Sequence, residues 1–183
     1  FAAPGGIIGV NGGLFLYAQT EAEYASVMAH ELAHLSQRHF ARGLEAQQRM
    51  QVPVMAAMLA GIVAAAAGAG DVGIATIAST QAAAIQEQRR FSRQNEQEAD
   101  RIGMETLAKS NMDPNGIPSM FENMNERVRY ARSKPPEFLL THPLTESRIS
   151  DSANRARQYP RNVYTDNLNF QMMKERAELA LAS

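Results

Sequence analysis

The sequence predicts a mainly helical α+β domain, and three features of the chain lead to that prediction. Short apolar runs flank a Pro-Gly-Gly turn within residues 1–10, which is typical of a small β-hairpin. Beyond residue 20, apolar side chains recur at helical spacing in most segments. Helix-starting signals separate these segments, the first being Thr20 followed by Glu23, a capping box. We therefore expect a small N-terminal hairpin or sheet followed by helices.

The composition is that of an ordinary globular domain, and it excludes several kinds of partner and site. The chain has 183 residues, 45% of them hydrophobic, and a net charge of −1, which suits one domain with a substantial core. It contains no basic run or aromatic series of the kind that binds nucleic acid. The absence of cysteine excludes disulfides and thiolate metal ligands. Because the chain opens on Phe1 in mid-hairpin, we expect further residues, including any signal peptide, to precede it.

Turn and capping residues divide the chain into expected elements. Residues 1–17 are expected to be β structure, and a helix is expected from Thr20 to about Arg49, with Gly43 as its weak point. Its buried stripe would consist of Val27, Met28, Leu32 and Leu35. Apolar periodicity and helix-starting prolines predict four later helices, at residues 87–111, from 114 to a stop at Lys134-Pro135-Pro136, at 143–158 and at 167–181.

The segment 51–86 differs from the rest of the chain, because Asp71 is its only charged residue. We expect a helix to start at Pro53, to break near residues 68–71 and to resume afterwards. The stretch 52–70 is nearly long enough to span a bilayer, but alanine and glycine favour lipid only weakly. The expectation is a buried or mobile helical hairpin without stable membrane insertion. It could serve as a lid, as a client-binding surface or as a membrane contact.

The stretch His30-Glu31-Leu32-Ala33-His34 points to metal chemistry. Residues four apart lie on one face of a helix, so His30 and His34 could converge on one ion. Glu31 is placed to reach a metal-bound water without being a ligand itself. This H-E-x-x-H pattern is typical of zinc metallopeptidases, in which the glutamate is the general base. The alternative is a pair of unrelated helix histidines.

A catalytic zinc site needs a third protein ligand, and several residues could supply it. In the absence of cysteine the candidates are His39, His142 and the carboxylates. Glu96 and Asp100 lie four apart on one expected helix face, so one could bind zinc while the other orients a histidine. They could equally be ordinary solvated helix surface. We interpret His39, five residues beyond His34, as a surface or structural histidine that points away from the pair.

Taken together, His30-Glu31-x-x-His34 and Glu96-x-x-Ala99-Asp100 resemble the gluzincin family that includes the CAAX prenyl protease and the heat-shock protease HtpX. Pro4-Gly5-Gly6 is similar to that family's hairpin before the active-site helix. The stretches 34–42, 95–100 and 141–144 resemble most closely the soluble periplasmic branch, the BepA-like proteases of outer-membrane assembly. The resemblance covers most of residues 1–160.

The resemblance implies roles for three residues. Glu96 would be the third ligand, and Asp100 would support a histidine ligand through a hydrogen bond. In this branch a histidine at the position of His142 can occupy the fourth coordination site and keep the enzyme latent. The alternative for His142 is a helix-capping residue before Pro143. Arg148, in the helix that follows, could face the site and stabilise an oxyanion, or it could be a surface arginine.

We therefore expect a gluzincin-type zinc metallopeptidase domain at residues 1–160, with one zinc ion per chain. It would hydrolyse folded or misfolded envelope proteins in the periplasm, with extended substrate lying along the strand at residues 7–10. One alternative is a zinc-stabilised chaperone or assembly factor for outer-membrane proteins with little proteolysis, and another is an integral membrane protease. Family members of this type carry a C-terminal tetratricopeptide domain, so residues 161–183 would be a helical extension that begins a truncated region of that kind.

Overall fold

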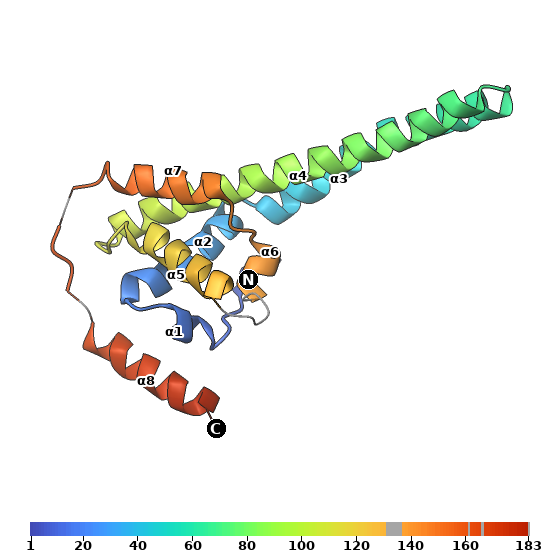
Figure 1. Ribbon diagram of the computed structural model, residues 1–183. Helices are drawn as coiled ribbons and strands as arrows, with labels where there is room; N and C mark the ends of the chain where they lie inside the picture. Colours follow the sequence, from blue (N-terminus) through green and yellow to red (C-terminus); the bar gives the residue numbers. More distant parts are fainter. Residues whose placement is uncertain (131–136, 161, 166, 183) are drawn as a thin grey trace. The chain divides into compact units, whose positions relative to one another are not determined.

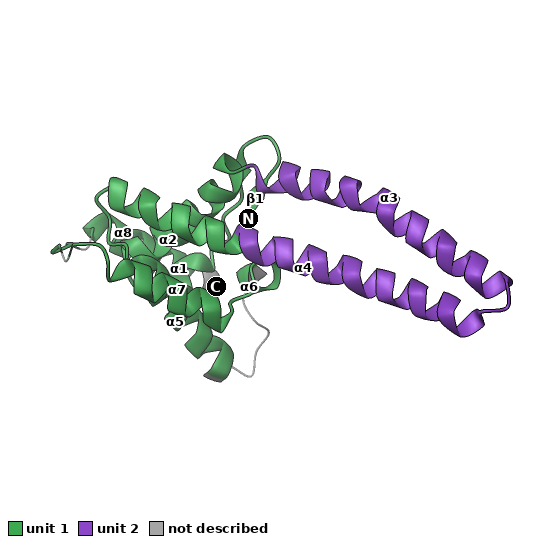
Figure 2. Cartoon of the chain, turned by 90° about the horizontal axis from the view of Figure 1, so that it is seen from above, with its two compact units in different colours: residues 1–37, 96–183 green, residues 38–95 purple. Residues whose placement is uncertain are grey.

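The computed structural model of the chain is mainly helical with one small sheet, which confirms the expected fold class (Figure 1). It describes residues 1–130, 137–160, 162–165 and 167–182, so the expected helix stop at Lys134-Pro135-Pro136 lies outside the described residues. Two compact units divide the chain (Figure 2). Unit 1 comprises residues 1–37 and 96–183, and unit 2 comprises residues 38–95. All of the residues with an expected role in the site belong to unit 1.

The N-terminal residues form a hairpin and a short helix. Strand β1 (Ala2–Ala3) pairs antiparallel with β2 (Ile7–Ile8), with Ala2 opposite Ile8. The expectation of β structure through residue 17 is wrong at its end, because Leu14–Tyr17 form helix α1. This turn of helix directs Leu14 and Phe15 onto the apolar core, and the alternation of a strand would have separated these two neighbours.

Helix α2 (Glu21–Ser36) carries the H-E-x-x-H stretch and begins with the predicted capping box. Thr20 is the N-cap, and its hydroxyl accepts a hydrogen bond from the Glu23 backbone N–H at 3.2 Å. The Glu23 carboxylate accepts from the backbone N–H of Gln19 at 2.5 Å. It also accepts from the side chains of Ser119 and Asn123 on α5 (Gly116–Tyr130). One buried glutamate therefore both caps α2 and joins it to α5.

Two expectations for α2 are wrong. The helix ends at Ser36 instead of near Arg49, because Arg38 adopts a left-handed backbone conformation with φ of 55° and a new helix follows. Leu32, expected in the buried stripe, is 48% exposed. The buried face is instead largely polar and contains Glu23, Ser26, Val27, Ala29, His30, Glu31 and Ala33.

Unit 2 is a pair of helices made by α3 (His39–Ala66) and the first part of α4 (Gly70–Lys109). Pro53 lies inside α3 instead of starting a helix, and the two helices expected at 72–86 and 87–111 are one continuous helix. The expectation that this hairpin is buried is wrong for most of its length, since side chains such as Val52 are largely exposed. By length and composition alone, α3 is the one helix among the described residues that could cross a membrane.

The rest of α4 returns to unit 1 and packs closely on α2. A Cβ atom added to Gly103 would lie 3.2 Å from the backbone nitrogen of His30, so only glycine allows this approach without a shift. Asp100 and Glu96 lie about one and two turns before Gly103 on the same helix. The glycine therefore brings both carboxylates towards the first histidine of the H-E-x-x-H stretch.

Three helices complete unit 1: α6 (Glu137–Thr141), α7 (Glu146–Ala156) and α8 (Leu168–Ala182). The expected helix start at Pro143 is wrong, because Thr145 is the N-cap of α7 and accepts from the Arg148 backbone N–H. Phe170 of α8 joins a core formed with Ala18, Val27, Met120 and Met124. Helix α8 thus packs on unit 1, and its role as the start of a repeat region stays a prediction.

Candidate metal centre

Four side chains with an expected metal-binding role lie together in unit 1. One nitrogen each from His30, His34 and His142 and one carboxylate oxygen of Glu96 all lie within 4.8 Å of one another. Helical spacing on α2 brings the Nε2 atoms of His30 and His34 to 3.0 Å. His142 follows α6, and its Nδ1 atom lies 3.3 Å from His30 Nε2 and 3.0 Å from Glu96 Oε1.

The distances between these donor atoms fit a four-coordinate metal ion. In a tetrahedral site with bonds of about 2.0–2.1 Å, neighbouring ligand atoms lie about 3.3–3.4 Å apart. Glu96 lies 3.4 Å from His30 Nε2 and 3.5 Å from His34 Nε2. Two imidazole nitrogens 3.0 Å apart can share only one proton, so a cation between them would use lone pairs that otherwise oppose each other. Three nitrogens and one oxygen are also a donor set that zinc accepts.

Charge and burial at the centre favour a divalent cation. Three carboxylates are buried at the centre, those of Glu31, Glu96 and Asp100, together with the guanidinium of Arg148, so these four side chains by themselves carry two negative charges in excess when the histidines are neutral. Burial alone would raise the pKa of Glu96, but hydrogen bonds to His142 and His30 hold it well below its usual range. Burial alone would lower the pKa of His142, but its contacts with Glu31 and Glu96 raise it to about 9. The site attracts positive charge, which a metal ion would supply in place of protons.

Asp100 fixes the orientation of His30. The Nδ1–H group of His30 donates a hydrogen bond to Asp100 Oδ1 at 2.9 Å, because a carboxylate can only accept. The other ring nitrogen, Nε2, therefore presents its lone pair to the metal group. The pKa of Asp100 would be raised by burial, but the Arg148 guanidinium and His30 lower it, so the carboxylate is ionised.

Arg148 is engaged with the carboxylates of the centre. Its Nε and Nη2 atoms each donate to Asp100 at 2.7 Å, and its Nη1 atom lies 3.0 Å from Glu96. The same Nη1 donates to the Pro143 carbonyl at 2.9 Å. The side chain is 3% exposed, so the alternative of a surface arginine is wrong. These contacts favour a role in positioning the two carboxylates over the expected role at an oxyanion.

Glu31 lies beside the donor group without belonging to it. It is 1% exposed, and neither carboxylate oxygen has a hydrogen-bond partner among the described residues. His142 Nε2 comes within 3.2 Å of Glu31 Oε1, an ion-pair distance without hydrogen-bond direction. Burial would raise the pKa of Glu31, but His142 and His30 lower it. A buried, ionised carboxylate with unused acceptor atoms is suited to take a proton from a nearby water.

Sequence comparison assigns the chain that carries this centre to a family. The sequence model of peptidase family M48 matches residues 1–156. The chain belongs to peptidase family M48. The resemblance drawn from the motifs is thereby confirmed.

Individual M48 relatives match nearly the whole chain. The Vibrio cholerae protein named "Putative beta-barrel assembly-enhancing protease" is 49% identical over 96% of the chain and 36% of that protein. The beta-barrel assembly-enhancing protease of Escherichia coli is 42% identical over the same shares. The mitochondrial metalloendopeptidase OMA1 of Arabidopsis thaliana is 29% identical over 81% of the chain and 27% of that protein. The chain spans about a third of the length of the two bacterial relatives.

One aromatic residue of this M48 domain contacts the centre without having been singled out in the sequence. The ring of Phe138 on α6 stacks on His142, with centroids 4.8 Å apart and an interplanar angle of 25°. The backbone N–H of His142 donates to the Phe138 carbonyl at 2.8 Å. The spacing of four residues on a short helix is the signal that could have found it. His39 does not belong to the metal group of the described residues.

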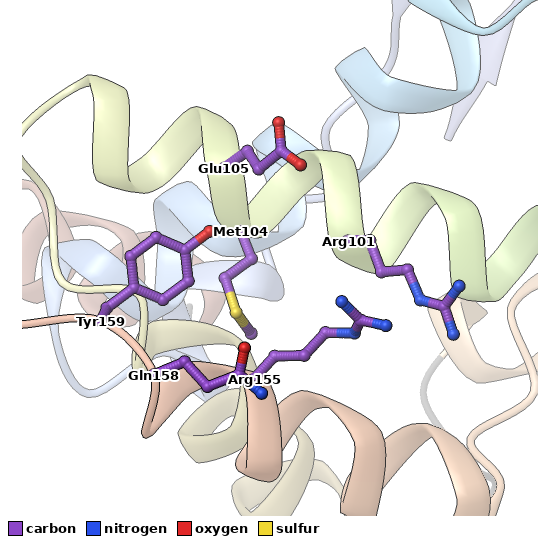
Figure 3. A pocket seen from close by; sticks show the side chains of 6 residues that line it. All are labelled: Arg101, Met104, Glu105, Arg155, Gln158 and Tyr159. Atoms are coloured by element: carbon purple, nitrogen blue, oxygen red, sulfur yellow. The ribbon is translucent and has the colours of Figure 1, made fainter.

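A cavity of about 250 Å³ lies elsewhere in unit 1 (Figure 3). It is lined by Arg101, Met104, Glu105, Arg155, Gln158 and Tyr159. Arg101 and Arg155 both contact Asp151, at 3.3 Å and 2.9 Å. No residue with an expected metal-binding or catalytic role lines this cavity, so the candidate catalytic groups of the described residues lie at the metal centre instead.

Proposed function

We propose that this M48 domain is a zinc-dependent endopeptidase with Glu31 as its general base. The proposal rests on one observation, the convergence of the His30, His34 and Glu96 donor atoms beside the Glu31 carboxylate, whose oxygens accept no hydrogen bond among the described residues. These three residues would hold zinc, which when bound supplies a Lewis acid that acidifies water and polarises a carbonyl. Glu31 takes the proton of the attacking water and passes it to the leaving amine as the peptide C–N bond breaks.

We propose that His142 keeps the site closed in the resting domain. Its ring lies between the donor group and the base, with Nδ1 3.0 Å from Glu96 and Nε2 3.2 Å from Glu31. A water that donates its proton to Glu31 needs the space that this imidazole fills. Stacking on Phe138 supports the ring in that place. Substrate would reach the water position only after His142 has moved.

Metal analysis tests the ligand set. The purified protein should contain one zinc ion per chain, and His34→Ala or Glu96→Ala should each weaken zinc binding by at least about 100-fold, because each removes a direct ligand. A chelator should remove the peptidase activity and added zinc should restore it. Glu122→Gln, which changes an exposed carboxylate on α5, is the matched control and should bind zinc normally. Full zinc binding by the His34→Ala and Glu96→Ala variants would exclude this centre.

Removing the blocking imidazole tests latency. The His142→Ala variant should cleave casein several-fold faster than wild type at equal zinc content, because the water position becomes free. Glu122→Gln, an exposed change outside the metal group, should leave the rate unchanged. A slower His142→Ala enzyme would instead make His142 a catalytic or substrate-binding group.

We propose polypeptides of β-barrel assembly as the substrates. The names of the two bacterial relatives refer to that process. Transmembrane β-barrels belong to the outer membrane, so the reaction would take place in the periplasm. An extended segment of substrate would add to β2, where Ile7 is 62% exposed.

A further inference from the structure

The hairpin of unit 2 has an exposed apolar end that the proposed chemistry does not use. We call residues 50–86 the apolar tip. Large side chains within it are mostly in solvent, including Val63 at 67% and Ile74 at 68% exposed. Soluble monomers rarely expose so extended an apolar surface without a partner for it. We propose that the apolar tip inserts into lipid bilayers that carry anionic head groups.

The composition of α3 favours lipid over a partner that binds one face. Between residues 50 and 67, Gln51 is the only polar side chain, so every face of this part of the helix is apolar. A helix that is apolar all round belongs either in a protein core or in a membrane. Only 6% of the most apolar 18-residue stretch of α3 is buried, so a protein core does not account for this helix and a membrane is the remaining environment. A polypeptide client in a groove would instead need one apolar stripe opposite a polar face.

The charges of the hairpin lie where lipid head groups would meet them. Six exposed arginines, which we call the arginine collar, lie at the other end of the two helices: Arg38, Arg42, Arg49, Arg89, Arg90 and Arg93. Only Glu45 and Glu87 oppose them there, whereas the apolar tip contains a single charge, Asp71. Arginines beside an apolar segment are attracted by anionic lipids.

The length of the tip agrees with the thickness of a bilayer. The 18 residues from 50 to 67 extend over about 27 Å as a helix, against about 30 Å for the hydrocarbon core. With the arginine collar at one head-group layer, Asp71 beside the connecting turn would reach the opposite layer instead of remaining in hydrocarbon. The one charge of the tip is therefore compatible with insertion.

The three hydroxyl groups within the tip are satisfied inside the hairpin. The hydroxyls of Thr76 and Thr80 donate to backbone carbonyls of α4 at 2.8 Å and 2.7 Å, and Ser79 does the same at 3.0 Å. The two helices meet at Gly61 and Gly73, where a Cβ on Gly73 would lie 2.4 Å from the Gly61 carbonyl oxygen. Close packing through glycine is how helices associate in lipid.

Fluorescence can test the insertion directly, because the chain contains no tryptophan. In the intact protein, Val63→Trp should give a blue-shifted emission with vesicles of phosphatidylcholine and about one third phosphatidylglycerol, and brominated acyl chains should quench it. Val163→Trp, at a position that is 95% exposed outside the hairpin, should show neither effect. A response of the Val63→Trp variant to unfolded carboxymethylated lactalbumin but not to vesicles would overturn the proposal in favour of a client-binding surface.

Vesicle flotation tests the two ends of the hairpin separately. Val63→Glu should lower the vesicle-bound fraction at least ten-fold, whereas Val163→Glu should leave it unchanged. Replacing Arg49, Arg89 and Arg93 by glutamine should lower binding by roughly five-fold per arginine, while the same change at the exposed Arg129, Arg157 and Arg176 should have little effect. Glu31→Gln should float like wild type, so the result is independent of the proposed catalysis. Absence of flotation, or equal flotation of the two glutamate variants, would overturn the proposal.

Discussion

The Glu31→Gln variant should retain its zinc and lose peptidase activity by roughly 10²–10⁴-fold. Glutamine preserves the shape of a side chain that is 1% exposed, so the packing around it should not change. It cannot take the proton of the attacking water, however, because an amide has no basic oxygen at neutral pH. The measurement is casein cleavage at matched zinc content, and Glu122→Gln, an exposed change of the same kind, should be fully active.

The same variant separates two functions of the domain. Proteolysis retained by Glu31→Gln would show that another group is the base. If the variant loses proteolysis but still prevents aggregation of an unfolded outer-membrane polypeptide as wild type does, the main role would be that of a zinc-stabilised assembly factor. If Glu31→Gln loses both proteolysis and the ability to prevent aggregation, the second activity depends on the first.

Local spacing made the first half of the centre predictable. His30 and His34 are four residues apart on a helix whose capping box was visible at Thr20, so their convergence follows from helix geometry. The position of Glu96 could not be predicted in this way, because 58 residues of unit 2 separate the two halves of unit 1. No periodicity indicates that α4 returns to α2, and only the resemblance to a family selected Glu96 over the other candidates.

The error in the expected buried stripe of α2 has a physical cause in long-range pairing. The buried face of α2 holds Glu23, His30 and Glu31, and it leaves Leu32 48% exposed, which inverts the usual hydrophobic pattern. Glu23 and His30 can be buried there because α4 and α5 satisfy them through Asp100, Ser119 and Asn123. Such pairings join residues far apart in the chain, so hydropathy along one segment cannot reveal them.

Arg148→Met should cost the domain about 3–5 kcal/mol of unfolding free energy, because it leaves the buried Asp100 carboxylate without its cation. Arg155 on the same helix pairs with Asp151 near the surface, with side chains 38% and 32% exposed, and is the matched control. Arg155→Met should cost less than about 1 kcal/mol, since water screens that pair. Urea unfolding of the two variants measures the difference.

A further comparison separates support of the carboxylates from a role in catalysis. The double variant Arg148→Met with Asp100→Leu should be less destabilised than the sum of the two single changes, because the Asp100 charge is removed together with its cation. Zinc affinity should fall by about 10–100-fold in Arg148→Met, since Asp100 would orient His30 less firmly. If Arg148→Met is as stable as Arg155→Met and binds zinc normally but has a reduced kcat, the positioning role is contradicted. Arg148 would then stabilise the oxyanion, as first expected. Stability and metal affinity that fall together would instead mean that the arginine acts through Asp100 on the histidine that binds the metal.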